Sequence, residues 1–371
     1  MKESTPPPPS LSTAGNLQLK SQASKTIYKG IKVLKDIFTP LIAISAALLV
    51  GAIILVAANY NPLVAYEAMF QGAFRDLNSF VEVLLQAIPL ICIAAGLAVA
   101  FRCGIWNIGG EGQFYAGAVA CTVIGIYLKN IPGWILMPLV LIGGAVSGAL
   151  WGMLAGYLKN RFGANEVVTT IMLNYIAIIG TSYLVTGPMI ETVGKFPQTA
   201  QISESAWLPR ILYPTRLNIG IILALLLAVA MYLLIFKSSL GYAIRAVGNS
   251  PEAARYAGIN VKRNVLLAMA ISGGAAGLGG AIQVAGLTYR LFALISPGFG
   301  FTAIAVTLLV NNNPLGIILS GILFGVLSSG SELMQMNAKV PSVLVSVIEG
   351  LVILSVIAFG AYRAITLERE E

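Results

Sequence analysis

The chain has 371 residues, of which 57% are hydrophobic and 10% charged, and its mean hydropathy is +0.84. About a quarter of the residues in a soluble domain are charged, so this composition excludes an ordinary water-soluble protein. The net charge is +8, but the basic residues lie in short segments between apolar runs, which excludes a nucleic-acid-binding face and indicates membrane topology signals.

The first 36 residues are the most polar part of the chain. Four consecutive prolines at positions 6–9 are followed by a polar stretch and then by five lysines between positions 20 and 35. This pattern predicts a disordered tail over residues 1–36 that ends in a basic juxtamembrane segment. Because lysines beside a first span keep that side inside, we expect a cytoplasmic N-terminus.

Apolar runs of about 20 residues recur from Thr39 onward, each long enough to cross a hydrocarbon core about 30 Å thick. The runs are continuously apolar, which favours helices over the alternating strands of a barrel. We therefore predict an all-α membrane protein, with a transmembrane domain over residues 37–362 and a cytoplasmic C-terminal tail over residues 363–371. About ten spans are predicted, near residues 39–59, 79–101, 114–128, 133–157, 166–187, 217–236, 264–287, 297–311, 315–335 and 343–361.

The basic residues give these spans a direction across the cytoplasmic membrane. With the N-terminus inside, Lys159, Arg161 and the basic loop of residues 237–263 all fall in the cytoplasm, as does the C-terminus. Every short cytoplasmic loop with several charges then obeys the positive-inside rule. The short runs at 114–128 and 297–311 could instead be broken or re-entrant helices.

Two pentapeptides suggest an internal repeat. Gly148-Ala-Leu-Trp-Gly152 and Gly321-Ile-Leu-Phe-Gly325 share one pattern and lie on the fourth and ninth predicted spans. The second lies five spans after the first, so the two halves would be inverted and pseudo-symmetric, as in many transporters whose cargo passes between two repeats. Chance, or a shared rule for packing small residues, explains the pattern equally well.

Glycines interrupt the chain between the second and third predicted spans, beside a carboxylate. Unwound backbone at membrane depth is tolerated only where it is buried in protein or lines a water-filled cavity. We expect this segment to line a translocation path, with aromatic rings available to stack on a flat cargo. The alternative is a cytoplasmic turn in which the acid caps the next helix. The candidate path residues are Trp106, Asn107, Glu111, Gln113 and Tyr115.

The fifth predicted span begins with a polar stripe. Asn165 and Thr169, and approximately Thr170 and Asn174, recur at the helical spacing of four. Such a stripe faces protein or water, so it contacts either cargo or only neighbouring helices. An ionisable residue such as Glu166 indicates function if it lies at depth. The path candidates here are Glu166, Thr169, Thr170, Asn174 and Tyr175.

The basic loop of residues 237–263 contains the signals of a short helix. Ser250 suits the N-cap, Pro251 the first position, Glu252 the first turn and Gly258 the end. We predict that this helix docks a partner protein on the cytoplasmic side; a solvated connector is the alternative. The residues assigned to docking are Arg245, Ser250, Pro251, Glu252, Ala253, Ala254 and Arg255.

The chain lacks the residues that nucleotide hydrolysis would need. No Gly-x-x-x-x-Gly-Lys-Ser/Thr motif occurs, so energy must come from another subunit or from an ion gradient. Ion-driven carriers commonly use acids or histidines within their spans, and the few span acids here (Glu82, Glu166, Glu332 and Glu349) disfavour ion coupling. Histidine is absent and the three cysteines lack metal-ligand spacing. We expect no enzyme activity, metal or cofactor in this chain.

Three of these segments resemble the permease family of bacterial ABC importers for simple sugars, branched-chain amino acids and nucleosides. They are residues 106–113, 165–175 and 245–259, and the resemblance covers roughly residues 39–361. The family usually has Phe where this chain has Trp106, which keeps an aromatic side chain. The string Thr170-Ile-Met-Leu-Asn-Tyr175 is similar to the nucleoside branch rather than to the ribose branch.

The resemblance implies an importer that moves nucleosides across the cytoplasmic membrane. Its implied partners are a cytoplasmic ABC ATPase that holds ATP and magnesium, a second and related permease subunit, and an extracytoplasmic nucleoside-binding protein. A ribose-type sugar permease, a gradient-driven carrier and a non-transport scaffold remain alternatives. We expect a neutral cargo, because the predicted spans carry no Lys or Arg away from their ends.

Overall fold

A computed structural model describes residues 45–191 and 196–368, and the regular elements of this part of the chain are helices, with three isolated β-bridges. The predicted tail over residues 1–36 lies outside the described residues. The elements in chain order are a helix over Ser45–Ala57, α2 (Pro62–Phe74), α3 (Leu77–Arg102), α4 (Gly110–Tyr127), α5 (Gly133–Phe162), α6 (Glu166–Thr186), η1 (Glu204–Ala206), α7 (Gly220–Lys237), α8 (Ser239–Asn249), α9 (Pro251–Tyr256), α10 (Val261–Gln283), η2 (Val284–Thr288), α11 (Phe299–Leu309), α12 (Pro314–Asn337) and α13 (Ser342–Glu368).

Each of the ten predicted spans overlaps one of these helices. Within the described ranges, six helices are long and apolar enough to cross a membrane: α3, α5, α6, α7, α12 and the continuous segment Val261–Thr288. The chain is therefore an all-helical protein with several membrane-spanning helices. Two helices, α2 and α8, were not predicted. The helix α13 continues to Glu368, so most of the expected C-terminal tail is helical.

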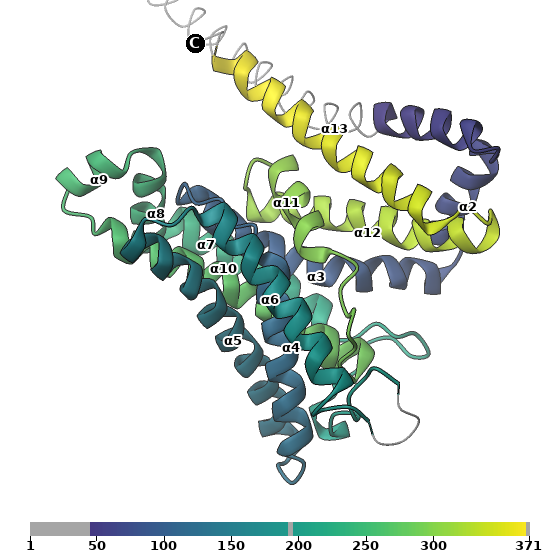
Figure 1. Ribbon diagram of the computed structural model, residues 1–371, viewed down its shortest axis with the longest axis horizontal. Helices are drawn as coiled ribbons and strands as arrows, with labels where there is room; N and C mark the ends of the chain where they lie inside the picture. Colours follow the sequence, from purple (N-terminus) through teal and green to yellow (C-terminus); the bar gives the residue numbers. More distant parts are fainter. Residues whose placement is uncertain (1–44, 192–195, 369–371) are drawn as a thin grey trace, which may run out of the picture.

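Two helices, α3 and α10, form the centre of the bundle and pack against each other (Figure 1). In the most apolar stretch of α3, 89% of the residues are buried, and in that of Val261–Thr288, 67% are buried. In the corresponding stretches of α5 and α6, only 22% of the residues are buried. The helices α4 and α5 pack on α10, and α11 and α12 pack on α3. Each central helix thus carries its own pair of partners.

Both repeated pentapeptides face a central helix. A Cβ atom added at Gly148 would overlap the backbone of α10, and one added at Gly152 would lie 2.5 Å from the Met269 carbonyl oxygen of α10. In the second pentapeptide, an added Cβ at Gly325 would lie 2.6 Å from the Val83 carbonyl oxygen of α3. These glycines are therefore contact points that allow helix backbones to approach closely.

The helix ends are grouped at two ends of the bundle. The helices α8 and α9 lie at one end, with the last turn of α5, and the turn between α4 and α5 lies at the other (Figure 1). At the α9 end, Asn160 of α5 donates to the Lys262 carbonyl oxygen (2.7 Å), and Arg102 of α3 donates to that of Asn311 (2.9 Å). The chain therefore alternates between the two ends as a polytopic membrane protein requires.

The long connection between α6 and α7 covers the end opposite α9. Its backbone N–H groups at Thr199 and Ile202 donate to the carbonyl oxygens of Leu291 and Tyr289, beyond the π-helical turn η2. An ion pair of 2.5 Å joins Glu191 of this connection to Arg290. These bonds fix the connection to the segment that leads into α11.

Candidate functional site

The chain between α3 and α4 turns back into the bundle after leaving α3. Residues 103–109 are not helical, and Gly104 has a φ of 75°. An added Cβ at Gly110, the first residue of α4, would meet the side chain of Ile93, nine residues before the end of α3. At 1.5 Å per residue, α4 begins about 14 Å from that end, inside the bundle. The predicted break is confirmed, although the helix resumes at Gly110, earlier than expected.

Several polar side chains meet at this depth. Asn107 donates through its Nδ2 to Gln113 Oε1 (3.1 Å) and to Ser272 Oγ (2.9 Å), and its Oδ1 accepts from the Gly109 N–H (2.9 Å). Gln113 Nε2 also donates to Asn107 Oδ1 (3.2 Å). Ser272 lies eleven residues into α10, or about 17 Å along it. The cluster is therefore near the middle of a core about 30 Å thick.

Two residues of α6 extend this cluster to the backbone of the break. Asn174 accepts through its Oδ1 from the Gly112 N–H (2.8 Å) and donates through its Nδ2 to the Ile108 carbonyl oxygen (2.8 Å). The Ile108 N–H donates to Thr170 Oγ1 (3.3 Å). We call Asn107, Gln113, Thr170, Asn174 and Ser272 the amide network; all five are buried. The network satisfies the unwound backbone inside the protein, as an apolar surrounding requires.

Glu111 joins the starts of two helices. Its side chain is 2% exposed, and its Oε2 accepts from the Gly300 N–H in the first turn of α11 (2.6 Å). The structure thus makes it a cap for α11, whereas the alternative considered from the sequence was capping of its own helix. Tyr115, one turn later, is also buried, and the Ser296 N–H approaches its hydroxyl at 3.5 Å. A carboxylate is stabilised beside helix N-termini, and here α4 and α11 both begin next to it.

The other path candidates lie away from the amide network. Trp106 and Tyr175 are 53% and 56% exposed, and Thr169 bonds only to its own helix. Glu166 is in the first turn of α6 and forms an ion pair with Lys159 of α5 (2.7 Å). It therefore lies at the α9 end of the bundle and not at depth, so the condition for a functional acid inside the membrane is not met.

The predicted short helix is present as α9. Ser250 caps it by accepting from the Ala253 N–H (3.3 Å), Pro251 occupies the first position, and Gly258 ends the segment with a φ of 80°. Ala254 is buried, whereas the docking residues Pro251, Glu252, Ala253 and Arg255 are exposed. The element and its boundaries are confirmed.

Arg245, the remaining docking candidate, lies on α8 and is only partly exposed. Its guanidinium carbon is 5.6 Å from the ring centre of Phe236. The guanidinium carbon of Arg102 on α3 is 5.3 Å from the same ring centre. A Cβ at Gly248 would overlap the Arg102 carbonyl oxygen. The helix α8 is thus packed directly against the end of α3, where the break begins.

The family described as the permease component of branched-chain amino acid transport systems matches residues 79–357. The chain belongs to this permease family. It is 38% identical to the guanosine ABC transporter permease protein of Bacillus subtilis, over 90% of this chain and 96% of that protein. It is 37% identical to the nucleoside ABC transporter permease protein of Lactococcus lactis (86% and 90%), and 36% identical to the glucose ABC transporter permease protein of Haloferax volcanii (88% and 89%). No solved structure gives a significant match.

The three motif segments of the permease are connected in space. Residues 106–113 bond to residues 165–175 through Asn174 and Thr170, and residues 245–259 touch the end of α3 through Gly248. Sequence reasoning missed Ser272, the network member on α10. The sequence shows Ser272 only as a polar residue within an apolar span. Nothing near it in the sequence indicates that it pairs with Asn107, which is 165 residues away.

Proposed function

We propose that this permease forms, with a second related permease subunit, the path by which a nucleoside enters the cell, driven by ATP that a separate subunit hydrolyses. The observation that carries the cargo assignment is the similarity, over most of the chain, to permeases named for guanosine and for nucleosides. The glucose permease of Haloferax volcanii is nearly as similar, so a sugar is the second candidate.

Two inverted halves, α3–α6 and α10–α13, account for the packing of the bundle. In this repeat α3 corresponds to α10, α4 to α11 and α5 to α12. The packing of α5 on α10 then corresponds to the packing of α12 on α3. The helices α4 and α11 both begin after a non-helical segment, at residues 103–109 and 289–298. The pentapeptides on α5 and α12 each face the central helix of the other half. These correspondences support the inverted repeat, which places the cargo path beside the broken helices.

In this proposal the amide network positions the break and lines the path only when it opens. Asn107, Gln113 and Asn174 have their polar atoms engaged with one another and with backbone groups, so they have little bonding capacity left for cargo while the network is closed. Trp106 and Tyr175 are exposed in the same state and have ring faces to offer. Opening during turnover would bring these two sets of side chains to the same cargo.

The helix α9 docks on the ABC ATPase, whose ATP and magnesium stay on that subunit. Docking fits the exposed row of Glu252, Ala253 and Arg255 on a helix that is anchored by buried Ala254. The contact of Gly248 with Arg102 then gives the ATPase a route to the start of the break. In this proposal the α9 end and both termini lie in the cytoplasm, and an extracytoplasmic nucleoside-binding protein docks at the opposite end.

Competition for uptake separates the nucleoside from the sugar. Cells or vesicles with the complete complex are given labelled guanosine together with excess unlabelled adenosine, uridine, ribose, glucose or leucine. We expect the nucleosides to reduce labelled uptake and the other three compounds to leave it unchanged. Competition by ribose or glucose, with none by nucleosides, would assign this permease to sugars.

A further inference from the structure

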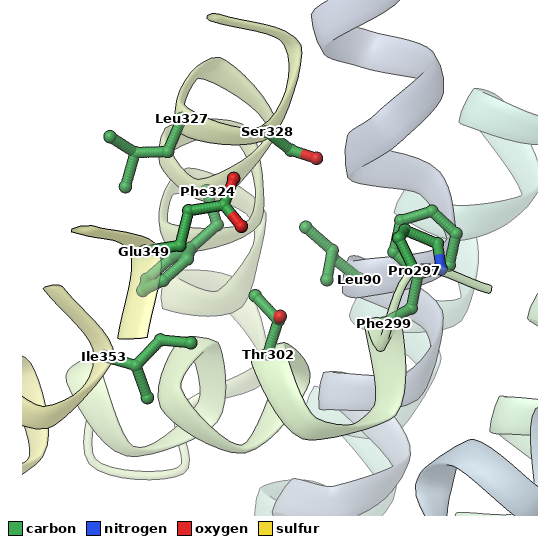
Figure 2. Close-up of a pocket in the computed structure, with 9 residues that line it drawn as sticks. All are labelled: Leu90, Pro297, Phe299, Thr302, Phe324, Leu327, Ser328, Glu349 and Ile353. Carbon is green, nitrogen blue, oxygen red and sulfur yellow. The ribbon is translucent and has the colours of Figure 1, made fainter. Parts of the chain in front are cut away.

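A recess lies between α3, α11, α12 and α13, away from the amide network. About 450 Å³ of space lies in and over it, a volume that includes open space outside the protein, so it is a shallow concave part of the surface and not a sealed void. Figure 2 shows Glu349 and Thr302 reaching from α13 and α11 toward a common space beside Leu90, with Ser328 of α12 at its edge. Phe299 and Phe324 line it as well, although only 5% and 4% of their surfaces are exposed.

The recess lies within the membrane-spanning part of the bundle. Leu90 is thirteen residues from the start of α3, Ser328 is nine residues from the end of α12, and Glu349 is seven residues from the start of α13. At 1.5 Å per residue these positions are about 10 to 20 Å from the end of the bundle opposite α9. A carboxylate at that depth is costly beside lipid, so the open side of the recess must face water or another protein.

A polar stripe leads from that end of the bundle to the recess. On α3, Glu82, Gln86 and Leu90 follow one another at the spacing of four that keeps side chains on one face. On α12, Ser328 and Glu332 have the same spacing, and Gln86 Nε2 donates to Glu332 Oε1 (3.1 Å). Nearer the outer end of the stripe, Arg216 donates to Glu82 Oε1 (2.6 Å). These groups would give a polar cargo hydrogen-bonding partners on its way to the recess.

The chemistry of the recess selects a class of cargo. A carboxylate accepts hydrogen bonds through both oxygens, so Glu349 suits a ligand with donors, such as the two adjacent hydroxyl groups of a ribose. None of the ion pairs within residues 45–191 and 196–368 includes Glu349, so no basic side chain of these residues forms an ion pair with it. The same charge repels a phosphorylated nucleotide. The apolar part of the lining, which includes Leu90, Phe299 and Ile353, suits the base of a nucleoside better than a free sugar.

We propose that the recess is this chain's half of the cargo site: Glu349 accepts hydrogen bonds from the ribose hydroxyl groups of a neutral nucleoside, and a second permease subunit closes the open side. The proposal rests on the proposed function, nucleoside import by the permease. It adds residues that the three motif segments do not contain, and it places a cargo site between α3, α11, α12 and α13, at a different point of the path from the amide network.

The test pairs a change in the residue with a change in the cargo. Vesicles carry the complete complex of both permease subunits, ATPase and binding protein, with this chain as wild type, Glu349→Gln or the control Glu67→Gln on exposed α2. Initial uptake rates are measured for labelled guanosine and for 2′,3′-dideoxyguanosine, which lacks the hydroxyl groups. Because the binding protein is the same throughout, its own preference cancels when the ratio of the two rates is compared between variants.

We expect Glu349→Gln to lower guanosine uptake at least about tenfold and to leave dideoxyguanosine uptake nearly unchanged, so that the ratio falls, because a hydrogen bond to a charged group is lost only with the natural cargo. The control should keep the wild-type ratio. Should Glu349→Gln fail to assemble, Ser328→Ala is expected to lower the same ratio about threefold. An unchanged ratio in the assembled variant overturns the inference, whereas uptake of neither compound by wild type overturns the proposed function itself.

Discussion

Asn107 holds the broken segment in the bundle through several buried hydrogen bonds. Its amide group bonds to Gln113, to Ser272 and to the Gly109 N–H. The Asn107→Ala change would leave these three buried groups without that partner, and we expect it to lower the free energy of unfolding by about 2 kcal/mol. Thermal unfolding of the purified permease in detergent measures the effect.

Thr169→Ala is a suitable control for that measurement. Thr169 also lies in a motif segment, but its hydroxyl bonds only to carbonyl oxygens of its own helix. We expect a change within about 0.5 kcal/mol, as for other substitutions outside buried networks. Equal destabilisation by both substitutions would contradict the central position assigned to Asn107.

Accessibility of single cysteines tests whether the amide network opens. The native cysteines Cys92, Cys103 and Cys121 are buried and are replaced by alanine before Gln113→Cys is introduced. Because Gln113 is 1% exposed, we expect a small hydrophilic thiol reagent to label it slowly at rest and faster during ATP-driven turnover. Labelling that stays slow under turnover would limit the network to a structural role and remove it from the path.

At the scale of whole elements, close backbone contact joins α10 to the helices around it. A Cβ added at Gly277 would overlap the backbone of α5, whereas Gly180 of α6 has nothing within 4 Å of the added atom. We expect Gly277→Ala to destabilise the permease by about 1 to 3 kcal/mol, because the helices must separate. Gly180→Ala should be neutral or stabilising by up to about 1 kcal/mol. Thermal unfolding of the two variants measures these changes. A similar loss of stability in both variants would contradict the close contact of Gly277 with α5.

The helix α9 can be tested by adding bulk on its exposed face. Ala253→Trp should abolish the docking of the ATPase, so that ATP hydrolysis no longer responds to cargo while membrane insertion persists. The matched control is Lys129→Trp, which adds the same side chain to an exposed position at the opposite end of the bundle. Wild-type uptake by the Ala253→Trp complex would exclude α9 as the coupling element.

Local sequence signals were sufficient for elements with strong boundaries. The cap, proline and glycine at Ser250, Pro251 and Gly258 predicted α9 residue by residue, and the apolar runs located the long helices. The helix α2 has the same kind of signal, since Asn61 caps it and Pro62 begins it. It was not predicted because the helices of this part of the chain were sought as membrane spans, and thirteen residues are too few to form one.

At the scale of the whole molecule, the sequence could not supply the contacts between distant segments. The return of residues 103–109 into the bundle depends on Ile93, Thr170, Asn174 and Ser272, which belong to three different helices. The recess likewise requires α3 to meet α11, α12 and α13. Such contacts arise from packing and leave no periodic pattern in the chain, so the candidate path residues could be named but their burial could not.

Reconstituted transport shows whether this chain is the path of an ATP-driven nucleoside importer. Vesicles containing the purified complex are supplied with labelled guanosine and its binding protein on the outside, and with ATP or a non-hydrolysable analogue on the inside, with no ion gradient. We predict accumulation of guanosine with ATP and none with the analogue or without this chain. Accumulation that needs an ion gradient and not ATP would rule out an ATP-driven importer.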